Sequence, residues 1–341
     1  MNFRSDNESP VNSKILNAII EANSGFEESY GYDNYTVKLQ DEMQKLFACW
    51  CEVIPLTTGT AANSLAVAIT TPPYGSILCS DNSHLNNDEC GAPEFYSAGA
   101  KLIGIAGENG KIDLDILTHT LNGMGVHAEH ECLPSAISIT QSTEAGTLYS
   151  LDELKRINNI KQKHGLYLHM DGSRIANAVA SMGCSIADMT WKSGVDILSF
   201  GATKNGAMIA ECLIIFNPKI GKEVKRQRKR AGQLISKMRF ISAQLLAYLK
   251  EDLWLNLAGH ANGMAQLVFE NLKSSHDFIY PVQANEVFLR INKEQIAVLK
   301  AQGFEFHVWP GSQDIIRLVF SHASREDEVK LLISALKSTK V

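Results

Sequence analysis

Apolar residues at the beginning of the chain recur with the spacing of a helix. Residues 13–23 place apolar side chains four positions apart, and residues 36–50 repeat this spacing. Side chains three or four positions apart share one face of an α-helix. Both segments are therefore predicted to be amphipathic helices.

Short apolar runs then alternate with further helical patterns. Residues 150–165 carry an apolar stripe that begins after a capping box of Ser150 and Glu153 and ends at Gly165. Strands separated by helices of this kind indicate a mainly parallel sheet covered on both faces. The runs predicted as strands are 76–80, 101–105, 136–140, 166–171, 195–200 and 212–216.

The pattern changes after about residue 218. Long helices are predicted within residues 219–273, and a last helix is expected from residue 324. Between them, three runs are predicted as strands, 286–291, 304–309 and 315–320. The pattern therefore divides the chain into an N-terminal segment (1–35), a large α/β domain (36–240) and a small α+β domain (241–341).

Length and charge are typical of a globular protein with two cores that binds neither nucleic acid nor an anionic membrane. A chain of 341 residues is long enough for one large and one small core, which agrees with this division. The net charge is −5 with both signs interspersed, which argues against a protein built to bind nucleic acid or an anionic membrane. The one basic run, residues 222–230, is expected to form a solvated helix face.

The cysteine pattern bears on metals and on the cellular compartment. None of the seven cysteines forms a CxxC pair or has metal-ligand spacing with a histidine. We therefore expect reduced thiols and no metal site. No apolar run is long enough to span a bilayer, and residues 1–10 hold no apolar signal region. These features together favour a cytoplasmic protein.

Lys204 is the first candidate for chemistry. It follows the apolar run 195–200 among small residues, and no other charged residue lies between Asp196 and Glu211 in the sequence. A lysine held in small, dry surroundings loses proton affinity and becomes a nucleophilic amine. The alternative is an ordinary solvated surface lysine.

Other polar residues stand at or just after predicted strand ends, where ligands bind in open α/β sheets. Asp171 closes the run 166–171, and His84 follows the run 76–80. Residues 57–60 (TTGT) precede a helix of small and apolar residues, so their N–H groups and hydroxyls could cradle a phosphate. Taken alone, a plain threonine N-cap and a solvated loop histidine explain these features as well.

Taken together, these residues match the needs of one cofactor. An amine, a carboxylate, an anion cradle and an aromatic ring are what pyridoxal phosphate requires from a protein. A carboxylate hydrogen-bonded to the pyridine nitrogen keeps that nitrogen protonated, which lets the ring draw electrons from a substrate carbanion. The combination therefore predicts a pyridoxal 5'-phosphate site around Lys204 and Asp171.

The sequence resembles the low-specificity threonine aldolases, a β-eliminating lyase branch of the fold-type I pyridoxal-phosphate enzymes. The resemblance covers nearly the whole chain, and its most specific part is the spacing between the aspartate and lysine motifs. The motifs that carry it are FRSD, YGYD, TTGTAAN, NSH with ECGA, HMDGSRIANAVA, SFGATKNG and IRLVFSHAS. It implies an aspartate-aminotransferase-like fold with an N-terminal segment that contributes to the active site.

The resemblance also implies a role for each matching residue around the cofactor. Lys204 resembles the lysine that forms a Schiff base with it, and Asp171 resembles the partner of the ring nitrogen. Arg174 resembles the arginine that contacts the ring 3-oxygen, and His84 the histidine that stacks on the ring. The implied phosphate-binding residues are Thr58, Gly59 and Thr60.

Further matches concern the substrate and a neighbouring subunit. Ser5 and Arg317 resemble the groups that grip the substrate carboxylate, a role that suits the fork of arginine. Tyr32 and Glu89 resemble residues that support the family's active site, Tyr32 on the substrate side. A disordered Ser5 and a solvated Arg317 are the alternatives. Arg239 resembles an arginine lent to the phosphate of an adjacent chain, which implies a dimer or tetramer with shared sites. Its alternative is an ion pair within its own chain.

The activity implied is cleavage of L-threonine or L-allo-threonine to glycine and an aldehyde, which makes the protein a carbon–carbon lyase. The expected base is His84, His130 or a water held between them, and His127 competes with His130 for the matching position. β-Elimination, racemisation and phenylserine cleavage by the same residues remain alternatives. A non-catalytic nucleotide-binding protein would leave Lys204 and Asp171 unexplained.

Three positions depart from the family pattern. Thr58 and Ser173 replace a common serine and a common alanine, and both changes keep or add a hydroxyl. Residues 140–146 (TQSTEAG) replace a common Glu-Asn-Thr at a strand end. This last change alters the wall near the cofactor, so it bears on the preferred substrate more than on the chemistry.

Overall fold

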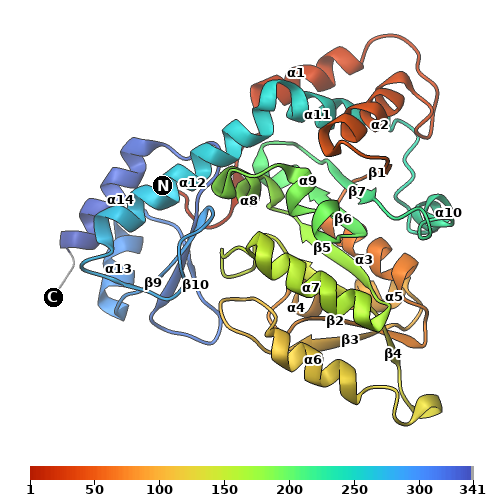
Figure 1. Cartoon of the computed structure of the whole chain (residues 1–341). Coiled ribbons are helices and arrows are strands. Elements are labelled where there is room, and N and C mark those ends of the chain that lie inside the picture. Colours follow the sequence, from red (N-terminus) through yellow and green to blue (C-terminus); the bar gives the residue numbers. More distant parts are fainter. Residues whose placement is uncertain (339–341) are drawn as a thin grey trace.

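A computed structural model describes residues 1–338, and Figure 1 shows a large domain beside a smaller one. Within these residues the large domain contains a seven-stranded sheet in the order β1-β7-β6-β5-β4-β2-β3. Its strands are β1 (Glu52–Leu56), β2 (Gly75–Ser80), β3 (Lys101–Ile105), β4 (Leu133–Thr140), β5 (Tyr167–Gly172), β6 (Ile197–Gly201) and β7 (Glu211–Ile215).

The predicted sheet is confirmed, with one strand added. Strands β2 to β6 pair in parallel, whereas β7 runs antiparallel to both β6 and β1. All six predicted runs are strands, but β1 was not predicted. It is short and contains Pro55, which lacks a backbone N–H, and it lies at the edge of the sheet, where a proline is tolerated.

Alternation along the strands buries both faces of the sheet. In β7, Cys212 and Ile214 belong to the core on one face, whereas Leu213 and Ile215 belong to the core on the other. Helices α3 (Gly59–Thr70) and α10 (Val224–Arg230) pack on the second face, and α5 (Ala92–Tyr96) packs on α3. The first face is covered by α2 (Asn34–Phe47), α6 (Leu114–Gly123), α7 (Leu151–His164), α8 (Ile175–Met182), α9 (Ile186–Met189) and α11 (Arg239–Leu249).

Helix α7 shows how local sequence sets an element. Ser150 Oγ accepts the backbone N–H of Glu153 at 3.1 Å, and Glu153 Oε2 accepts the backbone N–H of Ser150 at 2.7 Å. Gly165 ends the helix in the left-handed region with φ +66°, where glycine carries no side-chain penalty. The predicted capping box and C-terminal glycine are both confirmed.

The small domain is built on an antiparallel sheet. Among the described residues its strands pair in the order β10-β11-β9-β8. The strands are β8 (Asp277–Phe278), β9 (Glu286–Arg290), β10 (His307–Val308) and β11 (Ile315–Val319), and the helices are α12 (Leu253–Leu272), α13 (Lys293–Ala301) and α14 (Glu326–Ser338). The run predicted at 304–309 therefore contributes only two strand residues, and residues 339–341 lie outside the described part.

The packing places the division between the domains later than predicted. Ile241 and Leu245 of α11, together with Trp254 at the beginning of α12, lie in the core of the large domain. Val268 in the second half of α12 lies in the core of the small domain, where Phe3 of the N-terminal segment joins it. We therefore place the boundary within α12 rather than at residue 241.

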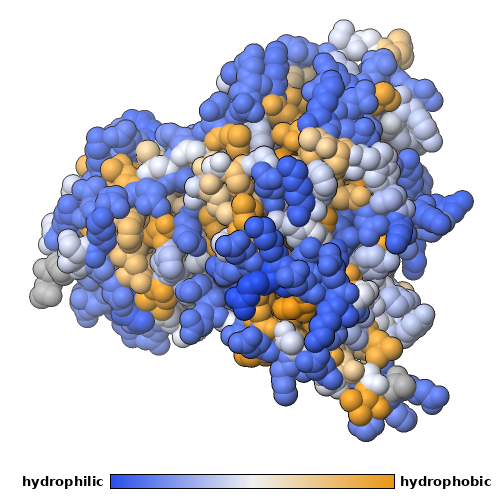
Figure 2. Space-filling model, viewed as in Figure 1, coloured by the Kyte–Doolittle hydropathy of each residue, from blue (hydrophilic) through white to orange (hydrophobic). Residues whose placement is uncertain are grey.

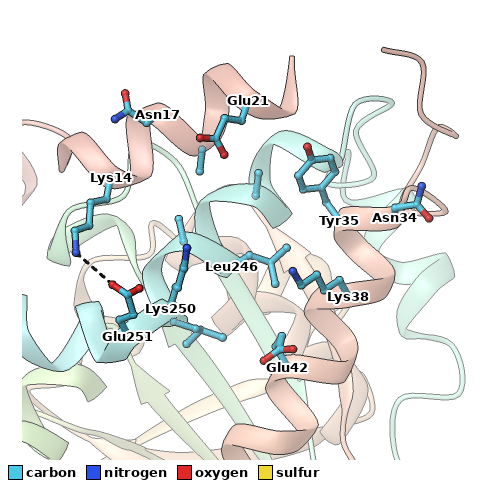
Figure 3. A pocket seen from close by; sticks show the side chains of 14 residues that line it. Lys14, Asn17, Glu21, Asn34, Tyr35, Lys38, Glu42, Leu246, Lys250 and Glu251 are labelled. Carbon is cyan, nitrogen blue, oxygen red and sulfur yellow. Dashed lines mark ion pairs between the residues drawn. The ribbon is translucent and has the colours of Figure 1, made fainter. Parts of the chain in front are cut away.

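A wide surface groove lies between α1 (Ser13–Ala22), α2 and α11 (Figure 3). Its volume is about 860 Å³, and charged side chains of both signs line it, among them the ion pair of Lys14 and Glu251 at 3.7 Å. None of the residues predicted for the site lines this groove. Along residues 1–338, no helix combines the length and the apolar character that crossing a membrane requires.

Candidate active site

A smaller cavity of about 290 Å³ lies at the carboxyl ends of the parallel strands. Chain segments that follow β4, β5 and β6 meet there because parallel strands end at one edge of the sheet. The N-terminus of α3 closes the opposite side. Seven residues predicted for the cofactor line this one cavity: Thr58, Gly59, Thr60, His84, Asp171, Arg174 and Lys204.

Lys204 lies in a short 3-10 helix, η4 (Thr203–Asn205), directly after β6. Lys204 lines the cavity, and its Nζ makes no hydrogen bond or ion pair with any described residue. The charge-free setting expected from the sequence holds only along the chain. In space, the carboxyl groups of Asp6, Asp171 and Glu211 interact with it electrostatically.

Asp171, near the end of β5, is buried and held by three hydrogen bonds. Ser173 donates to Oδ1 from its backbone N–H at 2.9 Å and from its hydroxyl at 2.6 Å, and Asn63 Nδ2 donates to Oδ2 at 2.8 Å. Burial alone would raise the pKa of Asp171. The Ser173 and Asn63 hydrogen bonds and nearby Lys204 outweigh it and lower the pKa, so this carboxylate stays ionised.

The N-terminus of α3 has the properties of an anion site. Thr58 caps the helix, and its hydroxyl oxygen accepts the backbone N–H of Ala61 at 3.1 Å. The backbone N–H groups of Gly59 and Thr60 have no hydrogen-bond partner among residues 1–338. A Cβ added to Gly59 would find only Ser173 Oγ within 4 Å, at 3.9 Å, so packing within the chain does not require glycine there. These free donors and this open space fit a bound phosphate.

His84 belongs to a hydrogen-bonded chain that reaches Asp171. Its Nδ1 lies 2.8 Å from Glu89 Oε1, and Asn63 Nδ2 donates both to this oxygen at 3.0 Å and to Asp171. The Glu89 hydrogen bond is the main cause that raises the pKa of His84. Glu89 therefore fixes one nitrogen of the His84 imidazole and favours the protonated form of that ring.

Replacing Glu89 with glutamine is therefore expected to lower the pKa of His84, because the neutral amide removes the charge that stabilises the imidazolium. The measurement is an NMR titration of the histidine side chains in wild-type and Glu89→Gln proteins. His322 provides the control. Burial lowers its pKa, Glu89 does not contribute to that shift, and its titration should be the same in both proteins. An unchanged His84 titration in the variant would show that Glu89 does not control this ring.

An outer cavity of about 600 Å³ adjoins the first and shares residues with it. Arg317 and Ser5, the two residues expected to grip the substrate carboxylate, both line this outer cavity. Arg317 is held loosely, with an ion pair to Glu286 of 3.9 Å and its guanidinium carbon 5.6 Å from the centre of the Trp309 ring. Its Nε has no partner among the described residues, so donors remain for a ligand.

Arg174 lies between the two cavities and is already paired. It donates to both carboxylate oxygens of the buried Asp6, from Nε at 2.7 Å and from NH2 at 3.0 Å. Its third contact is with Glu286 at 3.6 Å. The N-terminal segment thus reaches the site through Asp6, as the resemblance implied, and holds Arg174 at the cavity wall.

The structure does not bring every predicted residue to the cavity. His130 lies in η2 (Ala128–His130), before β4 begins, whereas the cavity lies beyond the other end of β4. The eight residues of that strand separate His130 from its own chain's cavity, and His127 lies on the same far side. This corrects the prediction that His130 is a base in its own chain. Tyr32 and Arg239 also lie away from the cavity.

Several residues of the site were not predicted. Asp6, Asn63, Glu144 and Glu211 contact or line the cavity, and Glu286 lines the outer one. Glu144 had a visible signal, because it is an acidic residue just after a strand end in the segment that departs from the family pattern. Asn63 and Glu211 lie close in sequence to predicted site residues but carry no pattern of their own. Asp6 and Glu286 are brought in by tertiary contacts between distant segments, which spacing along the chain does not reveal.

Comparisons with known proteins agree with this geometry. The family described as beta-eliminating lyase matches residues 2–294. A low specificity L-threonine aldolase of Pseudomonas aeruginosa is 42% identical over 312 residues, 91% of this chain and 89% of that enzyme. Another, from a Pseudomonas species, is 40% identical over 339 residues, 98% of this chain and 97% of that enzyme.

Among solved structures, a threonine aldolase of Leishmania major superimposes with a TM-score of 0.92 at 27% identity. The match covers 99% of this chain and 98% of that one. The chain belongs to the β-eliminating lyase family, and the expected fold-type I architecture is confirmed.

Proposed function

We propose that the protein cleaves β-hydroxy-α-amino acids such as L-threonine and L-allo-threonine to glycine and an aldehyde, with pyridoxal 5'-phosphate as cofactor. One observation carries this function. A single cavity joins a free lysine amine, a buried ionised aspartate and the open N-terminus of a helix, and it continues into a cavity that contains Arg317. The names of the Pseudomonas relatives support the same reaction.

The residues present fit the cofactor. Lys204 would hold its aldehyde carbon, Asp171 its ring nitrogen, and the free N–H groups of Gly59 and Thr60 its phosphate. His84 lies where an aromatic ring can cover one face. When bound, pyridoxal phosphate withdraws electrons from Cα of the amino acid, which allows a bond to that carbon to break.

The outer cavity supplies the part of the site that selects an amino acid. Arg317 lines this cavity and its guanidinium makes no hydrogen bond among the described residues, so a substrate carboxylate can accept two hydrogen bonds from its fork. Both oxygens of buried Glu286 lack hydrogen bonds among the described residues, and this carboxylate lies between Arg174 and Arg317. We infer that Glu286 orients both guanidinium groups and that Ser5 completes the substrate side. Tyr32 lies away from the cavity of its own chain, so it would serve the site of a neighbouring subunit.

Product analysis with L-threonine distinguishes the proposed reaction from its alternatives. Aldol cleavage yields glycine and acetaldehyde in equal amounts. β-Elimination would instead yield ammonia and 2-oxobutyrate, and racemisation would yield the D-enantiomer without loss of carbon. We expect equal amounts of glycine and acetaldehyde, and accumulation of 2-oxobutyrate or of the D-isomer in their place would contradict the proposal. Phenylserine, tested in the same way, reports on the breadth of the substrate class.

We further propose that the protein forms a dimer or a tetramer with shared sites. Apolar side chains remain exposed on α1, α2 and the loop between them: Leu16, Ile20, Phe26 and Val37. Figure 2 shows apolar residues among hydrophilic ones over this part of the surface. Arg239 donates to Gly25 O at 3.1 Å and so holds the same loop, while its Nε has no partner among the described residues. This surface supports a second copy that receives Arg239 at its phosphate site.

Mixing two inactive variants tests the shared site. Lys204→Ala and Arg239→Ala chains are each expected to be inactive or strongly impaired. A hybrid dimer contains one site in which both residues are intact, so part of the activity should return when the two proteins are co-expressed. If hybrids demonstrably form and no activity returns, Arg239 does not serve the neighbouring site. The control is co-expression of Lys204→Ala with Lys192→Ala, a variant of an exposed lysine. It measures the activity of hybrids in which only one of the two chains carries a disabling substitution.

A further inference from the structure

Glu144 stands four residues after the end of β4, at the junction of the two cavities. It lines both the inner cavity with Lys204 and the outer cavity with Arg317. A group at this position faces the region between the cofactor and the substrate carboxylate. The bonds that change in the proposed reaction belong to that same region.

The hydrogen bonds of Glu144 leave one of its oxygens open. Oε1 accepts the backbone N–H of His84 at 2.7 Å and the hydroxyl of Thr140 at 2.9 Å. Oε2 is shielded from solvent and has no partner within residues 1–338. A buried polar atom without a partner destabilises the protein, so this arrangement calls for a ligand that completes it. A substrate hydroxyl has the required chemistry, because it can donate to a carboxylate or accept from a carboxylic acid.

The electrostatic surroundings suit proton transfer. Burial is the main cause that raises the pKa of Glu144 to about 7, and the charge of Asp171 acts in the same direction, while the two hydrogen bonds oppose it. Arg174 also interacts with this carboxylate electrostatically, and His84 and Lys204 line the same cavities. A general base is most effective when its pKa lies near the working pH.

The other candidates fit this task less well. His84 has Nδ1 bound to Glu89, and its raised pKa favours the protonated form, which cannot accept a proton. His130 lies at the far end of β4. Burial also raises the pKa of Glu211 to about 7, but Glu211 lines only the inner cavity and accepts an N–H from Thr203, on the lysine side.

We propose that Glu144 is the catalytic base that takes the proton from the β-hydroxyl of the substrate, an inference that rests on the proposed function. The carboxylate accepts the hydroxyl proton and becomes a carboxylic acid. The O–H electron pair forms the C=O bond of the aldehyde, and the Cα–Cβ bond breaks with its electron pair left on the glycine fragment. Cα then takes a proton from water to complete glycine, and Glu144 returns the hydroxyl proton to water through the outer cavity, so that one proton is taken up and one is released.

The test compares two reactions of the same enzyme. Aldol cleavage requires loss of the β-hydroxyl proton, whereas exchange of the α-proton of glycine in D₂O requires the cofactor but no hydroxyl base. Glu144→Gln should lower the cleavage rate by about 10²–10⁴-fold and leave the exchange rate within about threefold of wild type. Glu144→Asp, which keeps a carboxylate, should recover part of the cleavage rate. Glu94→Gln is the control, because Glu94 has a similarly unpartnered buried oxygen but lines neither cavity.

Two further readouts separate a base from a structural residue. The rate of cleavage should rise with pH through about 7 in wild type, and Glu144→Gln should lose this limb. In the cofactor-free protein, the infrared band of protonated carboxyl groups that titrates near pH 7 should be smaller in the variant, with Glu211 supplying the remainder.

Three outcomes would overturn the assignment. Equal losses of cleavage and exchange in Glu144→Gln would mean that Glu144 only positions the site, and an unchanged infrared titration would mean that it holds no proton near neutral pH. If wild-type protein exchanges the glycine proton but cleaves no β-hydroxy amino acid, the proposed function fails and this role fails with it. Measuring exchange in both proteins distinguishes a failure of the Glu144 assignment, seen only in the variant, from a failure of the proposed function, seen already in wild type.

Discussion

Lys204→Ala is expected to lower the rate of aldehyde release by about 10³-fold or more, because the variant loses the one lysine amine that the described residues bring to the cavity. It should also lose the visible absorbance that pyridoxal phosphate gains when it is linked to a lysine. Both are measured on protein incubated with the cofactor, by an acetaldehyde assay and by an absorption spectrum.

The surface variant Lys192→Ala is the matched control for Lys204→Ala. Lys192 is paired with Asp188 on the outside of the molecule and should tolerate alanine without loss of either signal. Retention of more than a tenth of the wild-type activity in Lys204→Ala would show that another group performs this role. Loss of activity in both variants would point to damaged folding, which a comparison of their unfolding transitions would reveal.

Asp171→Ala should produce a different kind of loss. Asp171 is buried and ionised, so it can hold a proton on the ring nitrogen, and its removal takes a full charge from a site shielded from water. Removal of one preorganised electrostatic partner costs about 10²–10³-fold in rate in comparable sites. The cofactor should still attach to Lys204, because that amine is untouched. Reduction with borohydride followed by an absorption spectrum measures the attachment, and the acetaldehyde assay measures the rate.

The two variants are informative as a pair. Lys204→Ala should lose attachment and activity together, whereas Asp171→Ala should keep attachment and lose activity. Asp188→Asn, at an exposed position, should change neither. A variant of Asp171 that retained nearly full activity would show that the aspartate is not the partner of the ring nitrogen, even if the cofactor binds in this cavity.

Much of the fold could be predicted because the hydrophobic pattern is locally consistent. The strand that ends before Lys204 and the helix that begins at Leu151 each carry their signals within one segment. β1 and β10 carry weaker signals, since one contains Pro55 and the other has only two strand residues. The domain boundary was misplaced because α12 is continuous in sequence and serves two cores in succession.

Site residues could be predicted from the sequence where a reactive side chain stands at or just after the end of a predicted strand. Asp171 and Lys204 are of this kind, since adjacent parallel strands bring their carboxyl ends together. The pairing of Arg174 with Asp6 could not be predicted, because 168 positions separate the two residues in sequence. His130 was matched by position in the family pattern, which does not state on which side of the sheet a loop lies, and in its own chain it lies at the far end of β4 from the cavity.

We infer that the strand-end cavity holds the cofactor through Lys204. The most direct test is to load wild-type protein with pyridoxal phosphate, reduce it with borohydride, digest it and locate the labelled peptide by mass spectrometry. We expect one phosphopyridoxyl group per chain, on Lys204. A label on any other lysine, or no label on a protein whose folding is intact, would contradict it.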